Sequence, residues 1–228
     1  MSVIAFGLES LRFAPADATD DYGPLTTTSV MIIEGIVTTI GPDQQVHIAP
    51  MGPIVDSEMR RLVLRPFRTA QTYRNLKAHP EGVFHVTDDV LLLARAALGP
   101  VEPAPPTQPA SAVRGFILND ACRYYEFRLG SVDDREERGR MEAQVVHSGR
   151  LRDFLGFNRA KHAVLEAAIL ATRTDFLPHE EIDSEFRKLG VIVQKTGGEQ
   201  EKAAFAFLQE HLAQVVRLAR GAPAGFGP

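Results

Sequence analysis

The spacing of apolar residues changes near Gly149, and this change constrains the fold more than any other feature of the sequence. Before it, apolar residues form short runs rich in β-branched side chains, such as Val30 to Ile40, as β-strands do. After it, apolar residues recur at the spacing of one helix face, as at Ala160, Val164 and Ala168. Strands followed by helices, without regular alternation, predict a β-rich α+β fold.

The first part predicts strands with two helices among them. A Gly41-Pro42-Asp43 turn joins the run from Val30 to Ile40 to a second run from Gln45 to Ala49, which predicts a β-hairpin. The acidic and basic residues from Asp133 to Arg140 are expected to connect the last two strands. The remaining expected elements are strands at 59–64, 82–86, 113–129 and 141–147, and helices at 69–78 and from 90 to Gly99.

Prolines and caps mark the other boundaries. Pro100 to Pro109 contains five prolines in ten residues, which predicts a stiff connector without a regular strand ladder. Asn158 is expected to cap a helix that runs to about Arg173. Two more helices are predicted, one between Pro178 and Gly190 and one from Glu199 to Arg220.

Composition excludes several classes of protein. The chain has 25 lysines and arginines against 29 acids, a net charge of −4, so it lacks the basic excess of a nucleic-acid binder. No apolar run approaches the roughly 18 residues of a membrane span, and the N-terminal residues do not follow the pattern of a signal peptide. The single cysteine, Cys122, excludes an internal disulfide. We therefore expect a cytoplasmic protein.

Most known catalytic and metal-binding signatures are missing. The sequence contains no G-x-S-x-G, no H-E-x-x-H, no P-loop and no G-x-G-x-x-G motif. The His179-Glu180-Glu181 run is read as the acidic start of a helix rather than as a metal site. Cys122 lies in an apolar run and is interpreted as a core residue, with a thiol nucleophile as the alternative.

The segment from Arg65 to Leu76 is the first candidate site. It runs from a strand into the first turn of a helix, where backbone N–H groups lack partners within the helix. Two guanidiniums and two hydroxyls could converge there on an anion such as a phosphate, those of Arg65, Arg68, Thr69 and Thr72. The alternative is that Thr69 caps the helix and the arginines are solvated or pair with Asp88 or Asp89.

The second candidate is the run Ala49-Pro50-Met51-Gly52-Pro53. Its prolines fix the chain direction, Gly52 has no side chain to exclude a flat ligand, and the N–H groups of Met51 and Gly52 could bond a ring edge. The alternative is a simple strand-breaking turn. His47, just before it on a strand, either faces a ligand or is a solvent or core residue.

Together these segments resemble the flavin-reductase-like FMN-binding split barrels. In that superfamily a strand with an Asn-Ala-x-Pro run passes the isoalloxazine ring, an Arg/Lys-x-Thr-x-x-Asn-Ile element at a helix start binds the phosphate, and a Phe-Val-Val-Asn strand follows. The corresponding runs here are His47 to Met51, Arg68 to Leu76 and Val83 to Asp88. His47 stands where the superfamily commonly has Asn.

A subfamily found with tetrahydromethanopterin-linked one-carbon genes is more similar still. It shares the run LRPF-R-T-x-x-TY-x-NL and a later Asn-Arg-Ala-Lys helix, here Asn158 to Lys161. The similarity covers about residues 31 to 215. It implies an antiparallel Greek-key split β-barrel of six or seven strands at 30–149, a helical subdomain at 150–228 and an N-terminal extension at 1–29.

The resemblance also implies the cofactor and the assembly. FMN is the expected cofactor, held in a homodimer near the subunit interface. The expected cofactor-binding residues are His47, Ala49, Pro50, Met51, Gly52, Arg65, Arg68, Thr69, Thr72 and Asn75.

The expected function is that of an oxidoreductase in which FMN transfers hydride or electrons, with a link to pterin one-carbon metabolism. The alternatives are a flavin carrier without catalysis and a deazaflavin binder of the same fold.

Overall fold

A computed structural model describes residues 30–42 and 44–221; the predicted N-terminal extension and Asp43 of the predicted turn lie outside these residues. The chain divides into two compact units. One comprises the described parts of residues 1–89 and 99–155, and the other comprises 90–98 with the described residues from 156 onward. Each unit is described by itself below.

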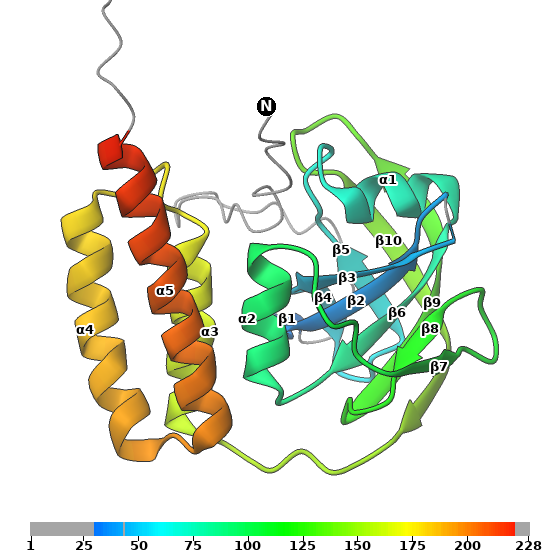
Figure 1. Cartoon of the computed structure of the whole chain (residues 1–228). Helices are drawn as coiled ribbons and strands as arrows, with labels where there is room; N and C mark the ends of the chain where they lie inside the picture. The colour runs from blue at the N-terminus through cyan, green and yellow to red at the C-terminus, as the bar shows by residue number, and fades with distance from the viewer. Residues whose placement is uncertain (1–29, 43, 222–228) are drawn as a thin grey trace, which may run out of the picture. The chain divides into compact units, whose positions relative to one another are not determined.

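The first unit is built on an eight-stranded sheet (Figure 1). Its order is β1-β4-β5-β10-β9-β6-β2-β3, and every neighbouring pair is antiparallel. The strands are β1 (Val30–Ile32), β2 (Gly35–Ile40), β3 (Val46–Met51), β4 (Ile54–Asp56), β5 (Arg61–Leu64), β6 (Glu81–Val86), β9 (Arg123–Asp133) and β10 (Arg140–Arg150). The sheet curls into a half-barrel, so the predicted split-barrel class is confirmed, with eight strands instead of six or seven.

Helix α1 (Gln71–Ala78) packs against β2 and β3 from one side of this sheet, near one end of the strands (Figure 1). Tyr73 and Leu76 of the helix join the core cluster that includes Val37, Phe84 and Phe127 of the strands. The N-cap position belongs to Ala70, not to Thr69, and no side chain caps this helix end. The alternative in which Thr69 caps this helix is therefore wrong.

The other face carries the proline-rich segment. Strand β7 (Thr107–Pro109) pairs with β8 (Phe116–Leu118), and Ile117 packs with Val83 of β6. The prediction that the prolines forbid a ladder is wrong for Thr107–Pro109. In a two-stranded ribbon, a proline can occupy a position at which no ladder N–H is required.

Two buried polar side chains fasten the segment to the sheet. His85 lies between the carbonyl oxygen of Ile36, 3.2 Å from Nδ1, and the N–H of Leu118, which donates to Nε2 at 3.1 Å. The Glu126 carboxylate accepts hydrogen bonds from the backbone N–H groups of three consecutive residues and from one hydroxyl, those of Ser111, Ala112 and Val113.

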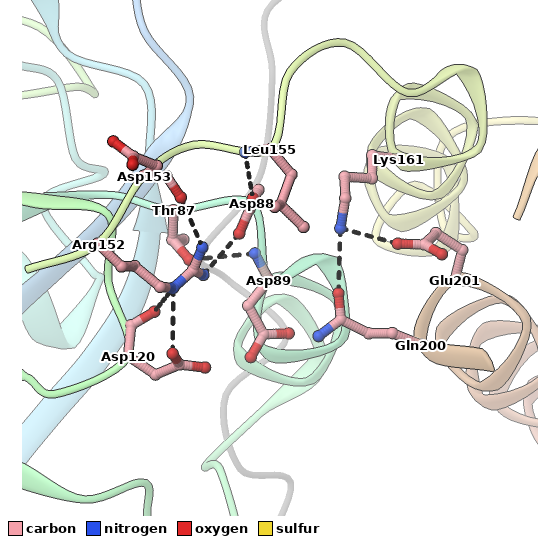
Figure 2. Close-up of polar contacts among 10 residues, drawn as sticks. All are labelled: Thr87, Asp88, Asp89, Asp120, Arg152, Asp153, Leu155, Lys161, Gln200 and Glu201. Carbon is pink, nitrogen blue, oxygen red and sulfur yellow. Dashed lines mark hydrogen bonds and ion pairs between the residues drawn. The ribbon is translucent and has the colours of Figure 1, made fainter. Parts of the chain in front are cut away.

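An ion pair fixes the end of β10 (Figure 2). Nη2 of Arg152 lies 2.6 Å from a carboxylate oxygen of Asp88, whose other oxygen accepts the N–H of Leu155 at 3.1 Å. Arg152 also donates to the backbone and side chain of Asp120. Asp88, which the sequence offered as a partner of Arg65 or Arg68, is thus bound to Arg152.

The second unit is helical and comprises α2 (Val90–Leu98), α3 (Arg159–Ala171), α4 (His179–Thr196) and α5 (Glu199–Gly221). Asn158 caps α3 as predicted, accepting hydrogen bonds from the N–H groups of Ala160 and Lys161. Lys161 forms a nearly buried ion pair with Glu201 at 2.8 Å and a hydrogen bond with Gln200 at 3.2 Å (Figure 2).

Helix α4 does not end at Gly190, as predicted, but continues to Thr196. A Cβ atom at position 190 would lie 3.3 Å from the ring of Phe205. The glycine therefore allows close packing between α4 and α5. Its cost inside a helix, about 1 kcal/mol relative to alanine, does not end the helix here.

Candidate functional site

The start of α1 is fixed by a neighbouring connection between strands. The N–H of Arg68 donates to the carbonyl oxygen of Glu137 at 3.1 Å, and the N–H of Gly139 donates to that of Pro66 at 3.0 Å. Phe67 and Arg138 form the bridge between these bonds. The residues between β9 and β10, which the sequence presents as a simple loop, thus hold the segment that enters the helix.

Gly139 is required by this arrangement. A Cβ atom there would lie 2.7 Å from the ring of Tyr73 on α1, so this ring can pack in its present place only against a glycine. The spacing of charged residues from Asp133 to Arg140 carries no sign of this contact.

The helix start is electropositive and uncapped. Its first turn contains no acidic residue, and the N-cap residue, Ala70, makes no side-chain cap hydrogen bond. Arg68 is exposed and Arg65 half-buried. Arg138, which the sequence analysis did not select, lies over the ring of Phe67 at 4.1 Å and donates to the carbonyl oxygen of Arg65 at 3.4 Å. Partial positive charge at a helix N-terminus and guanidinium groups both favour a bound anion.

The predicted residues further along the helix point inward. Thr72 and Asn75 are buried, at 2% and 0% exposure. The amide of Asn75 donates to Oγ1 of Thr39 on β2 at 3.0 Å and accepts from Nε2 of Gln71 at 2.6 Å. Thr69 is exposed. The five predicted residues of this segment therefore divide into an exposed pair, Arg68 and Thr69, a half-buried residue, Arg65, and a buried pair, Thr72 and Asn75.

Strand β3 carries the second predicted group, at an end of the sheet next to β2. Ala49 and Met51 lie on the face of the core that α1 covers, and Met51 packs against its cluster. Pro50, between them, lies on the opposite face. The interpretation of this run as a strand-breaking turn is wrong for Ala49, Pro50 and Met51, which pair with β2, while the strand does end before Gly52 and Pro53. An edge strand tolerates the missing N–H of Pro50.

Gly52 follows the strand. A Cβ atom there would lie 2.8 Å from a carboxylate oxygen of Glu34 and 2.9 Å from a methyl group of Ile32. The absence of a side chain at position 52 makes room for these two neighbours.

His47 is half-buried on β3. Burial lowers its pKa below 6.5, and the positive charge of Arg74 on α1 lowers that pKa further. The imidazole is therefore neutral at physiological pH. Arg74 lies within the segment from Arg65 to Leu76 but was not among the predicted site residues. Its place in that segment, next to Asn75, was the only local feature that could have indicated it.

The other sequence candidates lie elsewhere. Cys122 is buried, and burial raises the pKa of its thiol, which agrees with its interpretation as a core residue. His179 begins α4. Among residues 30–42 and 44–221, no group of three His, Cys, Asp or Glu side chains could hold a metal ion. In the same residues, no helix is both long and apolar enough to cross a membrane.

The sheet and helices have the fold class of the flavin-reductase-like split barrels. An FMN-bound protein from Methanosarcina mazei, MM1853, has a similar structure with a TM-score of 0.69 and 22% identity, covering 79% of this chain and 94% of that one. The flavin reductase of styrene monooxygenase from Pseudomonas putida S12 has a TM-score of 0.44 and 12% identity, over 54% of this chain and 79% of that one.

The family follows from the sequence. The chain belongs to the DUF447 family: the model of its N-terminal domain, described as a protein of unknown function, matches residues 33–152. The model of the second DUF447 domain matches residues 158–210. MM1853 is described as a DUF447 protein too. No curated protein sequence matches the chain.

Proposed function

We propose that this protein binds FMN and uses it as an oxidoreductase. The observation that carries the proposal is the uncapped, acid-free start of α1 beside Arg65 and Arg68. A flavin phosphate is a dianion near neutral pH, and such a group is stabilised by helix N–H groups and guanidiniums together. The FMN bound by MM1853, which shares the fold, supports the same ligand here.

The phosphate is proposed to lie against the first turn of α1. Arg68 and Thr69 are exposed there, and Arg65 is half-buried on the approach to the helix. Thr72 and Asn75 would support this turn from below, since both are buried and Asn75 is bonded to Thr39.

The ring is proposed to lie along β3. His47, Ala49 and Met51 share the face of the strand that is turned toward α1. Pro50 and Gly52 would set the course of the chain past the ring. Bound flavin would supply hydride or electron transfer, while these residues bind and orient it.

Titration of the purified chain with FMN, followed by the quenching of flavin fluorescence, tests the proposal. We expect saturable one-site binding of FMN and weaker binding of riboflavin, which lacks the phosphate. Absence of FMN binding would contradict the proposal. Coenzyme F420 in the same titration tests the deazaflavin alternative, which tighter binding than that of FMN would favour.

Reduction distinguishes an enzyme from a carrier. The FMN-loaded protein is mixed anaerobically with NADH, NADPH or a reduced pterin, and the flavin absorbance is followed. If any donor bleaches the bound flavin faster than it bleaches free FMN, the protein is an oxidoreductase. If every donor bleaches bound and free FMN at the same rate, the result favours a carrier. The pterin link rests on the shared sequence runs alone. Failure of a reduced pterin to reduce the bound flavin would contradict it.

A homodimer with FMN near its interface is part of the proposal. It is supported by the resemblance stated above. Light scattering at micromolar concentration should give a mass of about twice the chain mass of 25.0 kDa. A monomer at that concentration would contradict it.

A further inference from the structure

The connection between β9 and β10, residues 134–139, contacts both the last turn of α1 and the segment that leads into its first turn. Asp134 forms an ion pair with Lys77 near the end of the helix, at 2.8 Å. At the other end, the N–H of Arg68 donates to the carbonyl oxygen of Glu137 at 3.1 Å. A connection from a distant part of the chain therefore fixes α1 and the entry segment, residues 65–69.

Phe67 of the entry segment and Arg138 of the connection are directly opposed in a short antiparallel bridge. The two hydrogen bonds of the bridge join the residues on either side of this pair, at 3.1 Å and 3.0 Å. Phe67 and Arg138 are thus a non-hydrogen-bonded pair, the arrangement that brings opposed side chains closest together. The guanidinium lies 4.1 Å from the centroid of the ring, where the quadrupole of the ring attracts a cation.

Arg138 also holds the backbone of the entry segment. Its Nη1 donates to the carbonyl oxygen of Arg65 at 3.4 Å. A planar guanidinium can make both contacts at once, because its face stacks on the ring while its edge donates. One side chain therefore fixes two positions of the entry segment, the ring of Phe67 and the backbone of Arg65.

Arg135 of the same connection has a different environment. It is exposed, and its guanidinium pairs at 2.5 Å with Asp133, two residues away. The connection thus supplies a control that carries the same charge as Arg138 but has a local partner.

We propose that Arg138 is a positioning residue for the proposed phosphate site: stacked on Phe67 and bonded to Arg65, it holds the entry segment in the course that presents Arg65 and Arg68 at the start of α1. Fixing donors before the ligand arrives lowers the ordering cost of binding. The inference rests on the proposed function. It makes the preference for FMN over riboflavin depend on a residue 73 positions from Arg65 in the chain.

The first test needs no flavin. Amide hydrogen exchange of the full chain is followed by NMR at the N–H groups of Arg68 and Gly139, the two donors of the bridge. We expect several-fold faster exchange at both in Arg138→Gln, because the bridge opens more often without its side-chain contacts. Arg135→Gln should leave both rates unchanged. Unchanged rates in Arg138→Gln overturn the inference.

The second test compares the affinities of the variants for FMN and riboflavin. Arg138→Gln should bind FMN several-fold more weakly and riboflavin as the parent does, while Arg135→Gln should bind both like the parent. Arg138→Lys should recover part of the FMN affinity, since an ammonium also lies favourably over an aromatic ring. An equal loss of both flavins would make Arg138 a support of the whole fold and overturn the inference.

Double variants distinguish positioning from direct contact with the phosphate. Arg138→Gln is combined with Arg65→Ala and, separately, with Arg68→Ala. A residue that acts through another gives a double variant whose loss is smaller than the product of the two single losses, and we expect this in at least one of the pairs. Losses that multiply in both pairs would make Arg138 an independent phosphate ligand and overturn the inference.

The tests also separate the possible failures. Unchanged amide exchange and FMN affinity in Arg138→Gln, in a chain that binds FMN, refute the role of Arg138 and leave the proposed function standing. Faster amide exchange in a chain whose parent binds neither FMN nor riboflavin refutes the proposed function and the phosphate role of Arg138 with it.

Discussion

Single arginine residues decide how strongly the proposed phosphate site binds. A charge-assisted hydrogen bond contributes about 1.5–3 kcal/mol. Arg65→Ala or Arg68→Ala should therefore weaken FMN binding by roughly ten- to a hundred-fold, which an FMN titration measures. Thr72→Val should have a smaller effect, since Thr72 is buried beneath the turn and supports it without being exposed to the phosphate.

Riboflavin is the control for this prediction, because it lacks the phosphate and should bind the arginine variants as it binds the parent. Arginine variants that bind FMN like the parent, or that lose riboflavin equally, would remove the phosphate from the start of α1.

His85 makes the free energy of unfolding depend on pH. Burial lowers its pKa to about 4, against 6.5 for an exposed histidine. Above about pH 6.5 both folded and unfolded forms are neutral there, and as the pH falls toward 4 only the unfolded chain gains the proton. The folded state should lose on the order of 3 kcal/mol across that window through this residue, as urea unfolding measures.

His85→Phe provides the comparison. The variant should be less stable at pH 7 by about 1–3 kcal/mol, because the N–H of Leu118 and the carbonyl oxygen of Ile36 lose their partner. Its deficit should shrink toward pH 4, since phenylalanine does not titrate. A deficit of the same size at both pH values would argue against a neutral buried His85.

Among single residues, the sequence selects exposed candidates at the helix start, while the long-range contacts that hold this segment in place leave no local pattern. The motif selected Arg65, Arg68 and Thr69 from a strand-to-helix boundary, which is a local feature. It gave no sign of Arg138, because the contact between Phe67 and Arg138 joins positions that are distant along the chain. Such a pairing depends on the register of β9 and β10, and no local pattern specifies it.

At the scale of elements, the Asn158 cap is the most direct local signal that the structure confirms. Its carboxamide accepts two N–H groups of α3 and donates to the carbonyl oxygen of Thr196 at 3.2 Å. Asn158→Ala should lower the free energy of unfolding by about 1–2 kcal/mol, as measured in urea. Gln194→Ala, at an exposed position inside α4, is the control and should change it by less than about 0.5 kcal/mol.

Element boundaries were less predictable than element types. Gly190 and Pro109 carry strong local signals for a break, yet one lies inside a helix and the other in a ladder. At Gly190, packing against Phe205 outweighs the helix-breaking preference of glycine, which is about 1 kcal/mol. At Pro109, the two-stranded ribbon does not require the N–H that proline lacks. Strands β1 and β4 are three residues long, too short for the alternation that identifies a strand.

At the scale of the whole molecule, the proposed ligand and the two compact units make separate predictions. Every proposed FMN contact belongs to the unit that contains the sheet. At a free FMN concentration of 100 times the dissociation constant, binding should stabilise that unit by about 2.7 kcal/mol. Hydrogen exchange with and without FMN, followed by mass spectrometry, should show slower exchange in β3 and at the start of α1.

The helices of the second unit provide the internal reference for that experiment. If the units open independently, exchange in α3, α4 and α5 should not change with FMN, because a ligand protects only the amides whose opening releases it. If they unfold together, the slowest amides of these helices should slow as well, while the rapidly exchanging ones stay as they are. Protection concentrated in α4 and α5, with none in β3 or α1, would place the ligand outside the sheet unit and contradict the site proposed at Arg68 and His47.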